Sequence, residues 1–213
     1  MNAMSPLTGN LFVISAPSGT GKTSLVAALC EELCGIVASV SYTTRAQRDQ
    51  ETNGIHYQFV SEVRFKEMLQ AGAFLEHACV FGNFYGTAEA AVQFELTAGT
   101  DVIVEIDWQG AAQIQSSIPN TSVFVLPPSI DILAARLRTR DQDNENVIQN
   151  RMATAVREIS HYREFDYLVV NDDFDAALES LKAIVVTARL KRTRQEAQLQ
   201  AILTSLTSEN VDE

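Results

Sequence analysis

The sequence is poor in positive charge for its length. Among its 213 residues, 16 are Lys or Arg and 27 are Asp or Glu, which gives a formal net charge of -11. A protein that binds along a phosphate backbone needs a broad basic surface, so this balance argues against nucleic acid as the main partner. It does not argue against small phosphorylated molecules, because a few cations gathered in one place can hold them.

Cysteines and long apolar runs are also scarce. The three cysteines, Cys30, Cys34 and Cys79, suit a reducing compartment better than a disulfide framework, and no further metal ligands accompany them. No apolar run approaches the roughly 18 residues that span a membrane, and the first ten residues do not resemble a signal peptide. We therefore predict a cytoplasmic protein without a membrane partner.

Short runs rich in Val and Ile alternate with helical patterns. The runs cover residues 10–16, 101–107, 121–128 and 167–172, and the first is followed by a helical pattern over residues 22–33. Strands that are apolar on both faces and separated by helices are typical of a parallel sheet covered by helices. The sequence thus predicts an α/β fold.

Two segments differ from this pattern. Residues 39–95 are rich in Tyr, Phe, Thr and Gly, with one clear helix at 61–72, so we predict an inserted small α+β domain. Residues 131–160 are helical and rich in arginine. A long helical pattern from about residue 175 to residue 206 closes the fold.

The stretch FVISAPSGTGKTSL, Phe12 to Leu25, joins the first strand to the first helix. Gly19 and Gly21 allow a loop whose N–H groups point inward, and the helix adds its positive N-terminal end. Lys22 would reach the β- and γ-phosphates of a nucleotide, and the Thr23 hydroxyl would bind Mg²⁺. A simple turn before a helix would not need the Gly-Lys-Thr sequence, so we predict a phosphate-binding loop.

Further stretches, taken together, resemble guanylate kinases of the bacterial type. They are SVSYTTRAQRDQETNGIHYQFV (39–60), FLEHACVFGNFYGT (74–87), VIVEIDWQG (102–110), RLRTRDQD (136–143) and NRMATAVREISHYREFDYLVVNDDFD (150–175). The resemblance runs from about residue 10 to residue 206, and the family also has alanine where this loop has Ala16 instead of the usual glycine.

The resemblance implies a fold like that of P-loop nucleoside monophosphate kinases. It also implies transfer of the γ-phosphoryl group of ATP to GMP, with Mg²⁺, for guanine nucleotide recycling and GTP supply. The implied domains are a core (1–38, 96–130 and 161–213), a GMP-binding domain (39–95) and a lid (131–160).

The residue types agree with an acceptor site for GMP. Arg45 and Arg48 can converge on one phosphate, and Tyr57 and Tyr85 can add hydroxyl groups. A carboxylate at Glu76 can accept the adjacent N1–H and N2 amino donors of guanine, and Thr87 can donate to O6. The full set implied for GMP is Ser41, Arg45, Arg48, Glu51, Tyr57, Glu76, Tyr85, Thr87, Glu105 and Asp107.

The donor site and the catalytic groups follow from the phosphate loop and from the resemblance. The lid arginines would stabilise the charge on the transferring phosphoryl group. For ATP the set is Ala16, Pro17, Ser18, Gly19, Thr20, Gly21, Lys22, Thr23, Arg136 and Asn171. The catalytic set is Lys22, Arg45, Arg136, Arg140, Arg151 and Asp107, and the metal residue is Thr23.

Four positions depart from the family pattern. Glu105 stands where aspartate is frequent, Gln47 replaces a proline, Gln50 replaces a glycine and Asp141 replaces the glycine of an Arg-Gly pair. We expect only a modest change in rate from Glu105. From the other three changes we expect a less preorganised acceptor loop and weaker nucleotide affinity or slower lid closure.

Other functions stay open at this point. A guanylate-kinase-like domain that has lost catalysis could serve as a binding module, although such domains typically lose the phosphate loop. A related small kinase could act on another nucleotide or on a sugar phosphate. A GTPase is disfavoured because no NKxD string is present. The sequence does not specify whether the chain forms a homo-oligomer.

Overall fold

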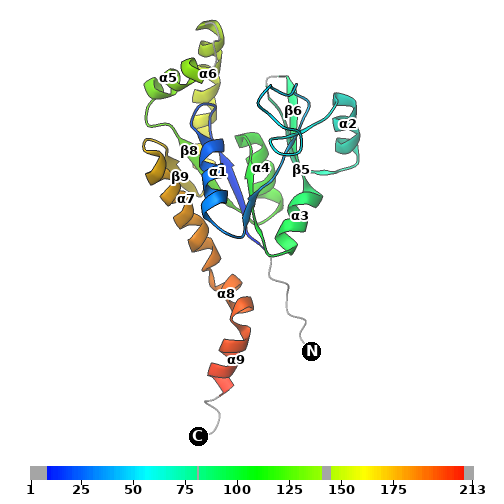
Figure 1. Cartoon of the computed structure of the whole chain (residues 1–213), viewed down its shortest axis with the longest axis vertical. Helices are drawn as coiled ribbons and strands as arrows, with labels where there is room; N and C mark the ends of the chain where they lie inside the picture. The colour runs from blue at the N-terminus through cyan, green and yellow to red at the C-terminus, as the bar shows by residue number, and fades with distance from the viewer. Residues whose placement is uncertain (1–8, 81, 141–144, 209–213) are drawn as a thin grey trace.

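A computed structural model describes residues 9–80, 82–140 and 145–208. Its centre is a five-stranded sheet in the order β2-β7-β1-β8-β9, and every neighbouring pair is parallel. The predicted parallel sheet is therefore confirmed, and Figure 1 shows helices on both of its faces. The strands are β1 (Leu11–Ser15), β2 (Ile36–Ala38), β7 (Asp101–Glu105), β8 (Thr121–Leu126) and β9 (Tyr167–Val170).

Two apolar layers hold the helices against this sheet. On one face Phe12 and Ile14 belong to a buried cluster with residues of α1 and α7. On the other face Leu11 and Val13 belong to a cluster with residues of α3 and α4. Side chains of a strand alternate between the two faces, so a strand covered on both faces must be apolar throughout. These helices are α1 (Lys22–Glu32), α3 (Glu89–Thr97), α4 (Trp108–Ser117) and α7 (Phe174–Arg189).

A second sheet is formed by residues between 42 and 88. Its four strands lie in the order β4-β3-β6-β5, with β3 and β4 parallel and the other pairs antiparallel. Phe65 of α2 (Glu62–Gln70) is fully buried and stacks on Phe74, with 4.5 Å between the ring centroids. The strands are β3 (Tyr42–Thr43), β4 (Gln58–Phe59), β5 (Phe74–Val80) and β6 (Asn83–Ala88).

Two arms rise from the end of the central sheet at which α1 begins (Figure 1). One arm is the second sheet with α2, and the other consists of α5 (Ile130–Arg140) and α6 (Glu145–Ser160), which is followed by a short 3-10 helix, η1 (His161–Glu164). Both arms therefore flank the carboxyl ends of the central strands, where ligands of open α/β sheets bind.

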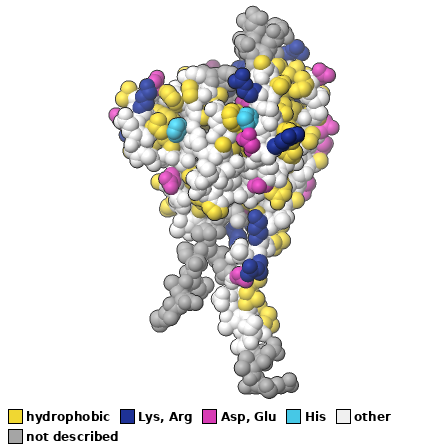
Figure 2. All heavy atoms as spheres, turned by 180° about the vertical axis from the view of Figure 1, so that it is seen from behind, with side chains coloured by type: hydrophobic (Ala, Val, Ile, Leu, Met, Phe, Trp, Pro, Cys, Tyr) yellow, Lys and Arg dark blue, Asp and Glu magenta, His cyan; other side chains and the backbone are white. Residues whose placement is uncertain are grey.

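The C-terminal helical pattern is divided into three helices instead of one. After α7 the chain forms α8 (Arg192–Gln198) and α9 (Gln200–Ser208), which extend away from the sheet in Figure 1. None of the described helices is long and apolar enough to cross a membrane. On the face seen in Figure 2 the coloured basic side chains do not form a broad basic area.

A buried carboxylate ties α8 to the core. Asp101 is fully buried and accepts hydrogen bonds from Arg189 Nε at 2.7 Å and Arg194 Nη1 at 2.5 Å. Its Oδ1 atom also accepts a bond from the backbone N–H of Asn10 at 2.6 Å. The starts of β1 and β7 are thus linked to α7 and α8 at the end of the sheet opposite the two arms.

Candidate active site

The loop between β1 and α1 has the backbone conformation that its glycines predict. Gly19 and Gly21 have φ angles of 88° and 89°, a region that side-chain-bearing residues rarely adopt. A Cβ atom on Gly21 would also lie 2.6 Å from Nδ2 of Asn171. No side chain caps the first turn of α1, so its N–H groups stay available to an anion.

The side chain of Asn171 holds this loop by a hydrogen bond. It is 5% exposed, and its Nδ2 atom donates to the carbonyl oxygen of Thr20 at 2.6 Å. Arg136 of α5 donates from Nη2 to the Asn171 carbonyl oxygen at 3.1 Å, and its buried Nη1 has no hydrogen-bond partner among the described residues. The two residues predicted near the donor nucleotide thus meet at the phosphate loop, with the Asn171 amide used to hold the loop.

Lys22 lies among acidic groups at the end of β7. Its Nζ atom donates to the carbonyl oxygen of Ile106 at 3.1 Å. Burial lowers the pKa of this ammonium, and the negative charges of Glu105 and Asp107 oppose the shift. Asp107 caps α4 by accepting the Gly110 N–H at 2.9 Å. The structure therefore brings the predicted lysine and both predicted acids together.

Thr23 and Glu105 offer oxygen atoms of the kind that Mg²⁺ prefers. The Thr23 hydroxyl donates to Glu105 Oε2 at 3.0 Å. Within the described ranges no group of three or more His, Cys, Asp or Glu residues could hold a metal ion by itself. Mg²⁺ usually keeps several waters and binds through one or two protein groups and substrate phosphates, and these residues fit that mode.

Glu158 of α6 belongs to the same group, and the sequence analysis missed it. Burial, and after it the charge of Asp107, raise the pKa of its carboxyl group to about 7, while the charge of Lys22 opposes the shift. The available signal was spacing, because Glu158 lies two helical turns after Arg151 and therefore on the same side of the helix.

The second sheet and the loop after β3 bring part of the predicted acceptor cage together, whereas the Arg48 side chain is exposed. Arg45 Nη2 pairs with Glu51 Oε1 at 2.7 Å, and the Arg48 backbone N–H donates to Glu51 Oε2 at 2.9 Å. The Arg45 guanidinium lies 5.5 Å from the centre of the Tyr57 ring, which is 6.0 Å from the Tyr85 ring. The hydrogen bond from Arg45 lowers the pKa of Glu51, so this carboxylate is an internal anion for the arginine.

Gln47, which replaces the family proline, closes the same loop. Its Nε2 atom donates to the Glu51 carbonyl oxygen at 2.5 Å. A side-chain hydrogen bond therefore constrains the loop where the sequence analysis expected a loss of preorganisation. Gln50 is exposed.

Glu76 is buried at the junction between the second sheet and α4. It is 3% exposed and accepts a hydrogen bond from Thr87 Oγ1 at 2.6 Å, while Ser41 Oγ lies 3.2 Å from the same hydroxyl. Burial raises the pKa of Glu76 to about 7, against the opposing effect of the Thr87 hydrogen bond. In this arrangement Thr87 donates to the carboxylate, whereas the sequence analysis expected donation to a guanine oxygen.

The predicted lid residues are placed in part. Arg151 is half-buried on α6, close in sequence to Glu158. Arg140 is the last residue of α5, and its side chain lies outside the described part of the structure. Asp141 also lies outside the described residues.

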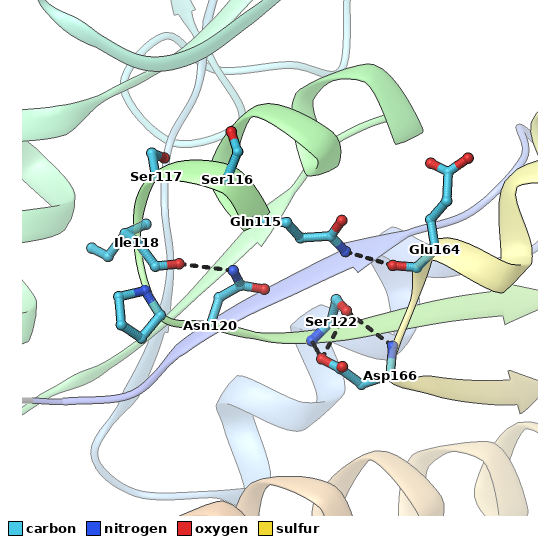
Figure 3. Close-up of a pocket in the computed structure, with 9 residues that line it drawn as sticks. Gln115, Ser116, Ser117, Ile118, Asn120, Ser122, Glu164 and Asp166 are labelled. Atoms are coloured by element: carbon cyan, nitrogen blue, oxygen red, sulfur yellow. Dashed lines mark hydrogen bonds between the residues drawn. The ribbon is translucent and has the colours of Figure 1, made fainter.

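A pocket of about 550 Å³ lies at the opposite end of the sheet, before β8 and β9 (Figure 3). Asp166 accepts from the Ser122 N–H at 2.8 Å and from its hydroxyl at 2.9 Å. Gln115 Nε2 donates to the Glu164 carbonyl oxygen at 2.8 Å. These polar groups form hydrogen bonds with one another, and they lie away from the carboxyl ends of the strands. We therefore assign the pocket a structural role.

Comparison with known proteins adds the family. The guanylate kinase family model matches residues 8–188. Guanylate kinase from Saccharophagus degradans is 54% identical over 202 residues, which cover 94% of this chain and 98% of that protein. The Escherichia coli K12 guanylate kinase is 52% identical over 201 residues, covering 93% and 97%.

A crystal structure of guanylate kinase from Anaplasma phagocytophilum has the same fold. Its TM-score with this chain is 0.75 at 33% sequence identity, with coverage of 89% of this chain and 90% of that one.

Proposed function

Because the chain belongs to the guanylate kinase family, we propose that it transfers the γ-phosphoryl group of ATP to GMP, giving ADP and GDP. The observation that carries the proposal is the position of the buried Glu76 carboxylate. It lies close enough to Asp107 and to Lys22 of the phosphate loop for both charges to act on its pKa. A carboxylate that would bind the guanine base and a lysine that would bind the phosphates thus lie in one site. The reaction would supply GDP for GTP synthesis and recycle guanine nucleotides in the cytoplasm.

ATP would bind with its phosphates in the loop from Ala16 to Thr23. The N–H groups of this loop, the start of α1 and the Lys22 ammonium supply positive charge. Mg²⁺ would be held by the Thr23 hydroxyl together with phosphate oxygens, with Glu105 beside it at 3.0 Å from the hydroxyl. When bound, the metal neutralises charge on the phosphates.

GMP would bind between the second sheet and α4. Its phosphate would take the place of Glu51 on Arg45, with Arg48, Tyr57 and Tyr85 around it. Its base would direct N1–H and the 2-amino group to Glu76.

Base choice follows from the burial of that carboxylate. AMP lacks the N1–H donor, so binding it would leave Glu76 without its partners, at a cost of about 1–3 kcal/mol. Each 1.4 kcal/mol is about a tenfold preference, so this contact alone would favour GMP over AMP by one to two orders of magnitude.

Phosphoryl transfer depends on position and charge more than on covalent help. Asp107 would lie between the two substrates, because its charge acts both on Lys22 of the phosphate loop and on Glu76. Arg136, Arg140 and Arg151 on α5 and α6 would stabilise the phosphoryl oxygens when this arm closes over the loop.

A coupled assay of ADP release tests the proposal. The protein is given ATP and Mg²⁺ with GMP, AMP, CMP or UMP, and Lys22→Met is the inactive control. We expect turnover with GMP and none with the other three. ATP binding without turnover on any acceptor would instead favour the catalytically impaired binding module, and turnover on another nucleotide would identify a kinase of different specificity.

A further inference from the structure

The side-chain amide of Gln113 joins α4 to the strand that carries Glu76. Gln113 Oε1 accepts the backbone N–H of His77 at 3.1 Å, and Nε2 donates to the His77 carbonyl oxygen at 2.8 Å. Both backbone groups of the residue next to Glu76 are therefore paired with one side chain. The pairing resembles one step of a strand ladder, made by an amide instead of a backbone.

This pairing occurs at a sheet edge that would otherwise be open. β5 is the last strand of the order β4-β3-β6-β5, so its outer backbone groups face away from β6. Gln113 is not required for the pairing of β5 within the sheet, because Glu76 and His77 are already paired with Thr87 and Gly86 of β6. What the amide adds is a fixed position of β5 relative to α4.

Gly110, one helical turn before Gln113, makes room for the carboxylate. A Cβ atom at this position would lie 2.4 Å from Glu76 Oε2, which no side chain tolerates. The N–H of the same glycine is bonded to Asp107. Glu76 thus lies directly against the first turn of the helix whose N-terminus Asp107 caps.

We propose that Gln113 is a positioning residue for guanine selection, which holds the Glu76 carboxylate in the space left by Gly110. The inference rests on the proposed function, because it assumes that Glu76 reads the base. In this proposal α4 positions both groups. Its N-terminus holds Asp107 next to the phosphoryl group, and its next turn holds Glu76, the carboxylate that binds guanine. The distance between base and phosphate in the acceptor site is then fixed by one helix.

The helix also provides a matched control. Gln115 lies two residues further along α4 and likewise donates from Nε2 to a backbone carbonyl oxygen, that of Glu164, at 2.8 Å (Figure 3). This bond lies at the far end of the sheet. Gln113→Met and Gln115→Met each remove a side-chain amide and keep a side chain of similar length.

The test measures binding by calorimetry, so that its result does not depend on turnover. GMP and IMP are used as ligands, because they differ only in the 2-amino group that the second carboxylate contact would read. For Gln113→Met we expect GMP to bind about fivefold to tenfold more weakly, as for the loss of one or two hydrogen bonds, and the preference for GMP over IMP to fall. ATP binding stays unchanged, and Gln115→Met resembles the natural protein in all three.

A double-mutant cycle separates positioning from a general effect on the fold. In a Glu76→Gln background, Gln113→Met should have no further effect on GMP binding, because the reader is already disabled. An equal effect in both backgrounds, or no difference between the Met variants at positions 113 and 115, would overturn the proposal. If the natural protein bound no GMP, the guanine reader and its positioning would both be wrong. GMP binding without turnover would contradict only the transfer reaction.

Discussion

Replacement of Glu76 by glutamine should remove a loss of stability that grows as the pH rises to about 7, and it should weaken the binding of GMP. The carboxyl group is 3% exposed, and burial raises its pKa from 4.5 to about 7. A raised pKa means that the fold disfavours the ionised form. The carboxyl group therefore costs no stability below pH 4.5, and its cost grows as the pH rises to about 7.

The full cost corresponds to about 3 kcal/mol of unfolding free energy. The amide that replaces the carboxyl group cannot ionise, so the variant does not incur this cost. The assay is urea unfolding of the natural protein and Glu76→Gln at pH 5, 6, 7 and 8. We expect the stability difference to move in favour of the variant by about 1.4 kcal/mol per pH unit up to pH 7, and then to level off.

The comparison between the two proteins isolates this group. Glu158, whose pKa is also raised to about 7, is present in both and cancels. The unpaired amide of the introduced glutamine shifts the whole curve by about 1–3 kcal/mol but does not change its slope. A stability difference that is constant from pH 5 to pH 8 would refute the reasoning, because it would mean that Glu76 ionises in the fold as it does in water.

Two further predictions concern the phosphate loop and the buried carboxylate of Asp101. Gly21→Ala should lower the free energy of unfolding by about 1–2 kcal/mol, because alanine is strained at this positive φ angle. It should also displace the Asn171 amide, which would lie 2.6 Å from the added Cβ atom. Titration should show at least tenfold weaker ATP binding, and an unchanged affinity would contradict the assigned loop geometry. Asp101→Asn should lower the free energy of unfolding by about 3 kcal/mol, because Arg189 and Arg194 lose a fully buried charged partner. The Michaelis constants of this second variant should stay unchanged, and a large change in them would mean that the C-terminal helices influence the site.

The parts of the fold that were predicted have strong local signals. Strands such as β1 are apolar on both faces, and the phosphate loop is continuous in sequence, so neither needs knowledge of distant contacts. The short strand β2 at residues 36–38 was missed, because only Ile36 among its residues is buried. The helix α4 was not predicted either, because its buried residues are two small ones, Gly110 and Ala111, and one isoleucine, Ile114.

The site could be predicted where residue types alone indicate chemistry. The phosphate loop, the acids at and just after the end of β7 and the Arg45 cage are of this kind. The hydrogen bonds that hold these groups in place were not predicted, because their partners are far apart in the chain. Asn171 and Thr20 are 151 positions apart, and Gln113 and His77 are 36 apart. Such contacts follow from the topology and have no local pattern.

The most direct test of the account is to follow the phosphorus atoms themselves. The protein is incubated with ATP, Mg²⁺ and GMP, and the products are identified by ³¹P nuclear magnetic resonance. The account predicts that ADP and GDP appear in equal amounts and that no ADP forms when GMP is left out. Release of inorganic phosphate without GDP would contradict it, because the γ-phosphoryl group would then be reaching water and not the nucleotide that Glu76 is proposed to read.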